Sequence, residues 1–486
     1  MRSERSFTPG AVVRRAAPPT CTKAAAPSRD AGRGGPPRRD GEVIAVLSAL
    51  EQRLDGSTAR ALASAVADAV ADGALRPGSR LPPIRVVARE LVLSPTTVSS
   101  AWALLCRWGL LRTDGRRGTT VRDSRADQPR YRQALSAGAH VRLDLSTGLP
   151  DGALLPSLPA GTGLWDLGAP SSCLDDPVLP GLAERIRADW PYDVAALTLT
   201  HGSLDALDSV FRCFLAPGDR VVVEHPTSPP VIDMLDTLGV STVGVPLDED
   251  GPDPAALKEA LRQPVSMVVL QARAHCPTGV STTPGRAAEL ARLLAESRAL
   301  VVEEDPMYGL YPEPPVTLGS WLPHRTVHIR GFAKGYGPEL RIAAVGGSED
   351  VVSALGARRR LGQGWTSRLL QRLLDAMLRD EATGAALRRA GAEYDRRRAT
   401  LTRELSALGV PVAGRDGLNV WVPVADESAA VAWLDGAGIG VSAGSAFMTL
   451  AEPQAYIRVT AGLVANGHAA LARQIAAASR YDLGRG

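Results

Sequence analysis

The chain has 486 residues, 45% of them hydrophobic, and 55 Lys plus Arg against 52 Asp plus Glu give a net charge of +3. These values exclude a wholly disordered or collagen-like chain and predict two to four globular domains. Because the charge is near neutral, any surface that binds a polyanion has to be local. Five scattered cysteines without a C-x-x-C pair argue against a disulfide framework or a metal site and suit the cytoplasm. No apolar run approaches the roughly 18 residues that cross a membrane.

Residues 1–44 are expected to form a disordered basic arm. Residues 1–40 are rich in Ala, Pro, Gly and Arg, and nine basic minus three acidic residues give them a charge of +6. Such a composition lacks the apolar periodicity that a packed core requires. The arm could help to hold DNA, but we favour a solvated tail or a start codon placed too early.

Residues 45–122 have the pattern of a small helical module that ends in a hairpin. Ser57 is expected to cap a first helix, a second helix follows Pro82-Pro83, and Ser94-Pro95 begins a third helix with a Ser N-cap and Pro at the first turn. Two short segments, 110–113 and 119–121, then flank a doubly basic tip and form a short hairpin. Three helices and such a hairpin predict a winged helix-turn-helix that binds double-stranded DNA.

The expected DNA contacts are hydroxyls on the third helix and basic groups around it. Hydroxyls and helix N-terminal amides suit phosphate oxygens, and arginines neutralise phosphates. The candidates are Ser94, Thr96, Thr97 and Ser100 on the third helix, Arg85 on the second, and Arg116, Arg117 and Gly118 in the wing. The alternative is a helical domain used only for dimerisation.

The string from Leu75 to Leu91, followed by Leu93-Ser-Pro-Thr-Thr-Val, resembles the GntR superfamily. The likeness covers about 65 residues and implies DNA binding. Val92 stands where the family usually has a turn glycine, and Pro95 and Ser99 stand where arginines often read bases.

After a linker at residues 123–142, the pattern changes to alternating strands and helices. Apolar runs at 221–224, 267–271, 300–304, 326–332 and 342–346 are expected to be buried strands, and 254–262 and 284–297 to be helices. Strands that are apolar on both faces predict an α/β domain with a doubly wound, mostly parallel sheet.

Charged and polar residues follow several of these strands. Lys334 lies directly after one strand, where a lysine faces the ligand crevice and can form a Schiff base with an aldehyde cofactor. Arg341 follows seven residues later, and Gly202, Ser203 and Leu204 begin a helix whose amides can hold a phosphate. Alone, the lysine and arginine are weak evidence, but the order and spacing of the whole set strengthen it.

This set, with Cys276-Pro-Thr-Gly, Glu304-Asp305 and Arg458, resembles the fold-type I aminotransferases, which use pyridoxal phosphate. The likeness covers residues 143–482, with a large subdomain at about 165–355 and a small α+β subdomain at about 356–482. Joined to the winged helix, the chain resembles a MocR-type regulator of the GntR superfamily. This implies a homodimer, pyridoxal phosphate on Lys334, phosphate contacts from Arg341 and Ser203, and a carboxylate site at Arg458.

The departures from that family gather around the cofactor ring. Ser228 replaces a stacking aromatic, and Cys276 replaces an asparagine that bonds the ring hydroxyl. Glu304 replaces the aspartate that pairs with the ring nitrogen; a shift of one residue would instead use Asp305, with Tyr308 at the ring hydroxyl, but would turn the strand over. We slightly favour Glu304.

The cofactor therefore either binds through Lys334 and the phosphate with altered ring contacts, or has been lost. We expect a transcription regulator whose C-terminal domain senses a small amine or amino acid, with inefficient transamination in either case. The alternatives are an active aminotransferase with a fused winged helix and a cofactor-free DNA-binding scaffold.

Overall fold

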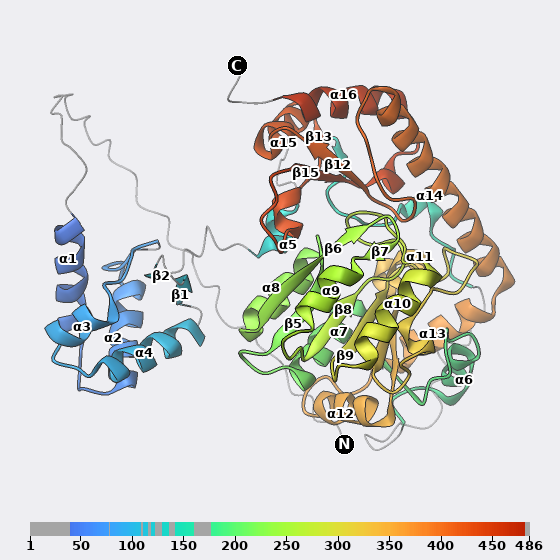
Figure 1. The fold of residues 1–486 in the computed structure, drawn as a ribbon. Coiled ribbons are helices and arrows are strands. Elements are labelled where there is room, and N and C mark those ends of the chain that lie inside the picture. Colours follow the sequence, from blue (N-terminus) through green and yellow to red (C-terminus); the bar gives the residue numbers. More distant parts are fainter. Residues whose placement is uncertain are drawn as a thin grey trace, which may run out of the picture. The chain divides into compact units, whose positions relative to one another are not determined.

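A computed structural model describes residues 39–76, 78–107, 110–114, 118–121, 129–135, 141–159 and 176–481. The chain divides into two compact units, residues 1–123 and residues 124–486 (Figure 1). Within the described ranges, no helix is long and apolar enough to cross a membrane.

The first unit is a helical module closed by a hairpin, as the sequence predicts. Its apolar helix faces and both hairpin strands share one core, in which Leu62, Leu105 and Val121 are almost fully buried. The elements are α1 (Arg39–Glu51), α2 (Ala59–Ala71), α3 (Ile84–Glu90), α4 (Pro95–Arg107), β1 (Leu111–Asp114) and β2 (Gly118–Val121). Strands β1 and β2 pair antiparallel, which makes the wing.

Two expectations for this unit need correction. Helix α1 begins at Arg39, inside the range assigned to the disordered arm, because Val46 and Leu50 of α1 belong to the same core as α2. The N-cap of α2 is Thr58 rather than Ser57, since the Thr58 side chain accepts the backbone N–H of Ala61. Ser94 does cap α4, because its Oγ accepts the backbone N–H of Thr97 at 2.9 Å.

The second unit is built on a mixed sheet of eight described strands (Figure 1). The order across the sheet is β4-β11-β10-β9-β8-β5-β6-β7, and the neighbours from β10 to β6 are parallel. Four of the predicted runs are parallel strands of this sheet. The bounds are β4 (Ala196–Thr200), β5 (Arg220–His225), β6 (Ser241–Asp248), β7 (Gly251–Pro252), β8 (Met267–Leu270), β9 (Leu300–Asp305), β10 (Thr326–Gly331) and β11 (Ala343–Gly347).

Helices cover both faces of the sheet, which confirms the doubly wound architecture. Alternate residues of one strand serve the two faces: Val221 and Val223 pack with α7 and α8, whereas Val222 packs with α9 and α10. The helices are α7 (Ser203–Phe214), α8 (Pro229–Leu238), α9 (Pro254–Ala260), α10 (Pro284–Ala295) and α12 (Glu349–Arg360).

Strand β11 departs from the parallel pattern because the segment before it is short. It pairs antiparallel with both β10 and β4. Residues 332–342 separate β10 from β11, and they contain only the short helix α11 (Ala333–Tyr336) and a 3₁₀ turn, η4 (Pro338–Leu340). A parallel crossover needs a dozen or more residues, so this segment turns the chain back beside β10. Lys334 and Arg341 are thereby held close to the carboxyl end of β10.

A smaller lobe covers the carboxyl ends of the large sheet. Its strands β12 (Val420–Val424), β15 (Ala455–Val459) and β14 (Ser442–Ala443) form an antiparallel sheet, and β13 (Ile439–Gly440) pairs with β3 (Leu143–Asp144). Its helices are α15 (Glu427–Gly436), α16 (His468–Arg480) and the C-terminal part of α14 (Glu381–Ala407). The remaining helices of the unit are α5 (Arg130–Gln133), α6 (Pro180–Ala188) and α13 (Arg368–Arg379).

The predicted segment boundaries are also corrected here. Helix α13 packs on α6, and its residues Leu374 and Met377 belong to the core of the large lobe, so that lobe extends beyond residue 355. Helix α14 joins both lobes, with Leu387 in one core and Leu401 in the other. The expected linker at 123–142 contains α5, which contacts α8 and the 3₁₀ turn η5 (Gly444–Phe447).

Candidate functional site

The candidate DNA-binding surface of the first unit is the start of α4 together with α3. The hydroxyl of Ser94 lies 2.7 Å from that of Thr96 and 2.8 Å from that of Thr97, and Thr96 and Ser100 are exposed. Arg85 on α3 is also exposed and makes no ion pair within the described part of the chain. Among its described residues, this surface offers hydroxyl donors and the arginine Arg85, groups that contact phosphates.

The wing is described only in part. Gly118 begins β2 with a φ of 89°, and a Cβ there would lie 3.1 Å from Nη2 of Arg80. Arg80 therefore packs against the base of the wing, a position that the sequence analysis did not single out. The predicted contacts Arg116 and Arg117 lie outside the described residues.

The second unit contains a cavity of about 310 Å³ where the large-sheet strand ends meet the small lobe. Its size lies at the lower end of the range for small-molecule sites. Nine predicted site residues line it, namely Gly202, Ser203, Leu204, Ser228, Cys276, Glu304, Lys334, Arg341 and Arg458. The topology thus brings together residues that are up to 256 positions apart in the sequence, counted from Gly202 to Arg458.

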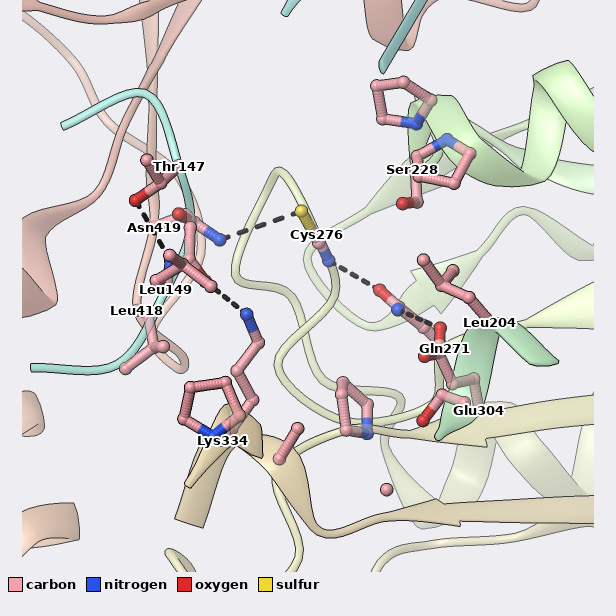
Figure 2. A pocket seen from close by; sticks show the side chains of 18 of the residues that line it. Thr147, Leu149, Leu204, Ser228, Gln271, Cys276, Glu304, Lys334, Leu418 and Asn419 are labelled. Carbon is pink, nitrogen blue, oxygen red and sulfur yellow. Dashed lines mark hydrogen bonds between the residues drawn. The ribbon is translucent and has the colours of Figure 1, made fainter. Parts of the chain in front are cut away.

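Lys334 is brought to the wall of this cavity by the turn that follows β10. It belongs to α11, and its Nζ donates a hydrogen bond to the backbone carbonyl of Gly148 (Figure 2). Burial lowers the pKa of Lys334, and the positive charge of Arg458 lowers it further, whereas Cys276 and Glu304 act in the opposite direction. A lysine with a lowered pKa supplies the neutral amine that attacks a carbonyl.

The start of α7 and Arg341 form a cradle for an anion. Gly202, with a φ of 96°, precedes α7 without a side-chain cap, so the amides of the first turn have no side-chain acceptor there. Arg341 also faces the cavity, and no acceptor within the described ranges pairs with it. Helix N-termini and free guanidinium groups both bind phosphate.

Gly331 makes room for this cradle. A Cβ at Gly331 would lie 2.4 Å from Oγ of Ser203, the first residue of α7. A side chain at this position would therefore require the Ser203 hydroxyl at the start of α7 to move.

Glu304 faces the cavity through the alternation of side chains along β9. Gln271 holds its carboxylate, since Nε2 of Gln271 donates to Oε2 of Glu304 at 2.7 Å (Figure 2). Oε1 of Gln271 in turn accepts the backbone N–H of Cys276 at 2.8 Å. Burial raises the pKa of Glu304, while the bond from Gln271 and the charge of Lys334 lower it in part.

Asp305 and Tyr308 do not line the cavity, which corrects the alternative register. Asp305 points to the opposite face of β9 and pairs with Arg273 at 2.5 Å. Tyr308 donates to Asp189 at 2.6 Å and stacks with Tyr336. The one-residue alternation of the strand places Glu304 at the ligand side and gives Asp305 a structural partner.

Arg458 forms the wall on the small-lobe side. Its guanidinium donates to the carbonyl of Ser146 and to Oγ of Ser442, at 2.8 Å for the latter, and lies 3.7 Å from Sγ of Cys276. These acceptors are neutral, and the Nε of Arg458 is buried without an acceptor. A buried arginine held only by neutral groups keeps its charge available for a carboxylate.

Several cavity residues were missed by the sequence analysis because no local pattern marks them. Asn419 precedes β12 and donates to Sγ of Cys276 at 3.7 Å (Figure 2). Gln271 directly follows the apolar run of β8, and that position at a strand end was the available signal. The others include Thr147, Leu149 and Leu418, and also Tyr131, Ala134 and Leu135 from the segment expected to be a linker.

The described residues offer neither an aromatic side chain at position 228 nor a group that could hold a metal ion. Ser228 precedes α8 and lines the cavity, but a serine cannot stack on a ring. Among the described side chains, no group of three or more His, Cys, Asp or Glu could hold a metal ion.

Two families match the two units. Residues 58–121 match "Bacterial regulatory proteins, gntR family". Residues 181–475, more than half of the chain, match "Aminotransferase class I and II".

Solved structures show the same fold for the second unit. Aspartate aminotransferase of Thermus thermophilus with maleate has a TM-score of 0.62 at 23% identity, over 72% of this chain and 99% of its own. The α-aminoadipate aminotransferase LysN, also of Thermus thermophilus, has a TM-score of 0.62 at 21% identity, over 73% and 98%.

Curated relatives contain both units. The vitamin B6 salvage pathway transcriptional repressor PtsJ of Salmonella typhimurium is 34% identical over 81% of this chain and 93% of its own length. The HTH-type transcriptional regulator TauR of Rhodobacter capsulatus is 26% identical over 75% and 83%. The chain therefore belongs to the MocR-type transcription regulators of the GntR superfamily, DNA-binding proteins with an aminotransferase class I and II domain.

Proposed function

We propose that this regulator is a cytoplasmic homodimer that binds a two-half-site operator and uses its C-terminal domain as a pyridoxal-phosphate-linked sensor. The observation that carries the proposal is the cavity of about 310 Å³ into which Lys334, Arg341 and Arg458 all face. Among the described residues that line the cavity, three basic side chains stand against one carboxylate, that of Glu304, which favours an anionic ligand.

The cavity fits pyridoxal phosphate at its phosphate and aldehyde ends. Arg341 and the start of α7 would hold the phosphate, because Arg341 has no other partner in the described residues and the first-turn amides of α7 have no side-chain cap at Gly202. Lys334 would meet the aldehyde, since its pKa is lowered by burial. The ring end differs from the family pattern, with Ser228, Cys276 and Glu304 as the available contacts.

Bound pyridoxal phosphate supplies an aldehyde that reacts with amines and a ring that withdraws electrons. The residues of this domain would bind and orient the cofactor and the effector. The Gly148 carbonyl holds the amine of Lys334, Gln271 fixes the carboxylate of Glu304, and Arg458 offers its charge to a carboxylate of the effector. The effector would accordingly be an amine or amino acid.

The same geometry argues against efficient transamination. Without an aromatic at Ser228, the stacking contribution of about 0.5–1.5 kcal/mol is missing. Glu304 reaches one methylene further than an aspartate, and a displacement of about 1 Å can cost of order a hundredfold in rate. Turnover of an amino acid with an oxo acid that is lost in Lys334→Ala would instead support an enzyme.

The relative PtsJ, described as a repressor of vitamin B6 salvage, supports two finer points. We propose that the ligand is a form of vitamin B6 and that the regulator represses transcription. Ligand binding would shift the population of dimers whose winged helices match the spacing of the operator half-sites.

A titration with pyridoxal phosphate, followed by visible absorption, tests the sensor. The protein should develop a new visible band that saturates with ligand, and Lys334→Ala should not. The absence of the band in the unsubstituted protein would leave a cofactor-free scaffold as the better account. A separate readout, thermal stabilisation of both proteins by the ligand, distinguishes attachment at Lys334 from binding alone.

A further inference from the structure

The connecting segment between the two units forms part of the ligand cavity. Tyr131, Ala134 and Leu135, from α5 and the residues just after it, line the cavity. Residues 122–128 separate them in sequence from β2, the last strand of the DNA-binding unit. A wall of the candidate sensor site is therefore covalently close to the winged helix.

Helix α5 is held by contacts from α8 and from Met448, which directly follows η5. Both carboxylate oxygens of Asp233 on α8 accept backbone N–H groups of α5, from Arg130 and Tyr131 at 3.0 Å each. Nη1 of Arg130 donates to the carbonyl of Met448 at 3.0 Å. The start of α8, at Ser228, lines the cavity too.

Apolar packing joins α5 to the basic group at the far wall. Ala134 is buried in a cluster with Trp421, Ala446 and Phe447. The guanidinium carbon of Arg458 lies 5.0 Å from the centre of the Phe447 ring. Phe447 therefore contacts both α5, through Ala134, and Arg458, so a ligand that binds Arg458 can affect the packing of α5.

We propose that α5 is a ligand-binding element whose docking on α8 and η5 is coupled to occupancy of the cavity. This rests on the proposed function, in which an anionic ligand binds between Arg341 and Arg458. The ligand would close against Tyr131 and Leu135 and stabilise α5 in its docked position. By thermodynamic reciprocity, loosening α5 weakens ligand binding by the same factor.

Hydrogen–deuterium exchange of the full chain, with pyridoxal phosphate as the probe, tests the coupling. The amides of residues 130–134 all have acceptors, either Asp233 or backbone carbonyls, so their exchange reports docking. Saturating ligand should slow exchange of the peptide that covers residues 129–135 by at least about fivefold, the lower end of typical allosteric couplings. Peptides from α10, which does not line the cavity, provide the internal comparison.

Substitutions of Asp233 test the reciprocal effect, because Asp233 does not line the cavity. Asp233→Ala should speed exchange at α5 and weaken ligand affinity by a similar factor, and Asp233→Asn, which keeps one acceptor oxygen, should lie between. Arg132→Ala, on the exposed side of α5, is the control and should change neither.

Two results would overturn these claims in distinguishable ways. If the ligand binds but exchange at 129–135 is unchanged, or if Asp233→Ala binds it as tightly as the unsubstituted protein, the coupling is refuted. If the unsubstituted protein shows no binding by absorption or by thermal stabilisation, the proposed sensor function fails, and the coupling fails with it.

Discussion

Val92 lies in the turn between α3 and α4 with a φ of 53°, in the left-handed region, and its side chain is 89% exposed. A left-handed conformation costs an L-residue about 1–2 kcal/mol, and β-branched residues suit it poorly. Glycine adopts it freely but adds about 0.4–1 kcal/mol of entropy to the unfolded chain. Because the exposed side chain contributes little packing, Val92→Gly should stabilise the first unit by about 1 kcal/mol.

Native-state hydrogen exchange measures this change within the intact chain. The most protected amides of α2 and α4 should exchange about fivefold more slowly in Val92→Gly, the factor that corresponds to about 1 kcal/mol. Val92→Ala is the matched control, because it removes the same methyl groups but keeps a Cβ at positive φ. Equal protection in the glycine and alanine variants, or no gain with glycine, would refute the assignment of strain to this turn.

Three further predictions concern DNA, protons and phosphate. Arg85→Ala should weaken binding to any duplex and reduce the slope of log affinity against log salt by about 1, which affinity measurements at several salt concentrations would detect. Burial raises the pKa of Glu224 to about 8, and that of His275 beside it is lowered to about 3. Between about pH 6.5 and 8, Glu224 keeps its proton in the folded state and has lost it in the unfolded state. The free energy of unfolding should therefore fall as the pH rises, by at most about 1.4 kcal/mol per pH unit, and Glu224→Gln should remove this fall. Parallel pH profiles of the two proteins in urea denaturation would contradict this prediction. Arg341→Ala should weaken pyridoxal phosphate binding by at least about tenfold and Arg341→Lys by less, because a lysine keeps the charge but not the fork; equal affinities by absorption titration would remove Arg341 from the phosphate site.

The sequence was informative where one local pattern determines the structure. Apolar runs predicted β5, β8, β9 and β10, and the Ser94-Pro95 pair predicted the start of α4. The position of Lys334 after a strand, together with the order and spacing of the other candidate residues, predicted a ligand crevice, because strand ends meet at one edge of the sheet.

Features that depend on distant contacts could not be read in this way. The choice between Glu304 and Asp305 depends on Arg273, which pairs with Asp305 and fixes the face that each carboxylate takes. Residues 130–133 are polar without periodicity, and they are helical because Asp233, about a hundred positions away, accepts their first amides. The direction of β11 follows from the length of the preceding turn rather than from its own composition.

Operator affinity with and without ligand shows whether a ligand at Lys334 controls DNA binding. An operator selected from random duplexes would be titrated at fixed salt, with and without saturating pyridoxal phosphate, for the unsubstituted protein and Lys334→Ala. We expect the ligand to change the affinity of the unsubstituted protein by at least about fivefold and to leave that of Lys334→Ala unchanged. Identical affinities with and without bound ligand in the unsubstituted protein would show that ligand binding does not control DNA binding.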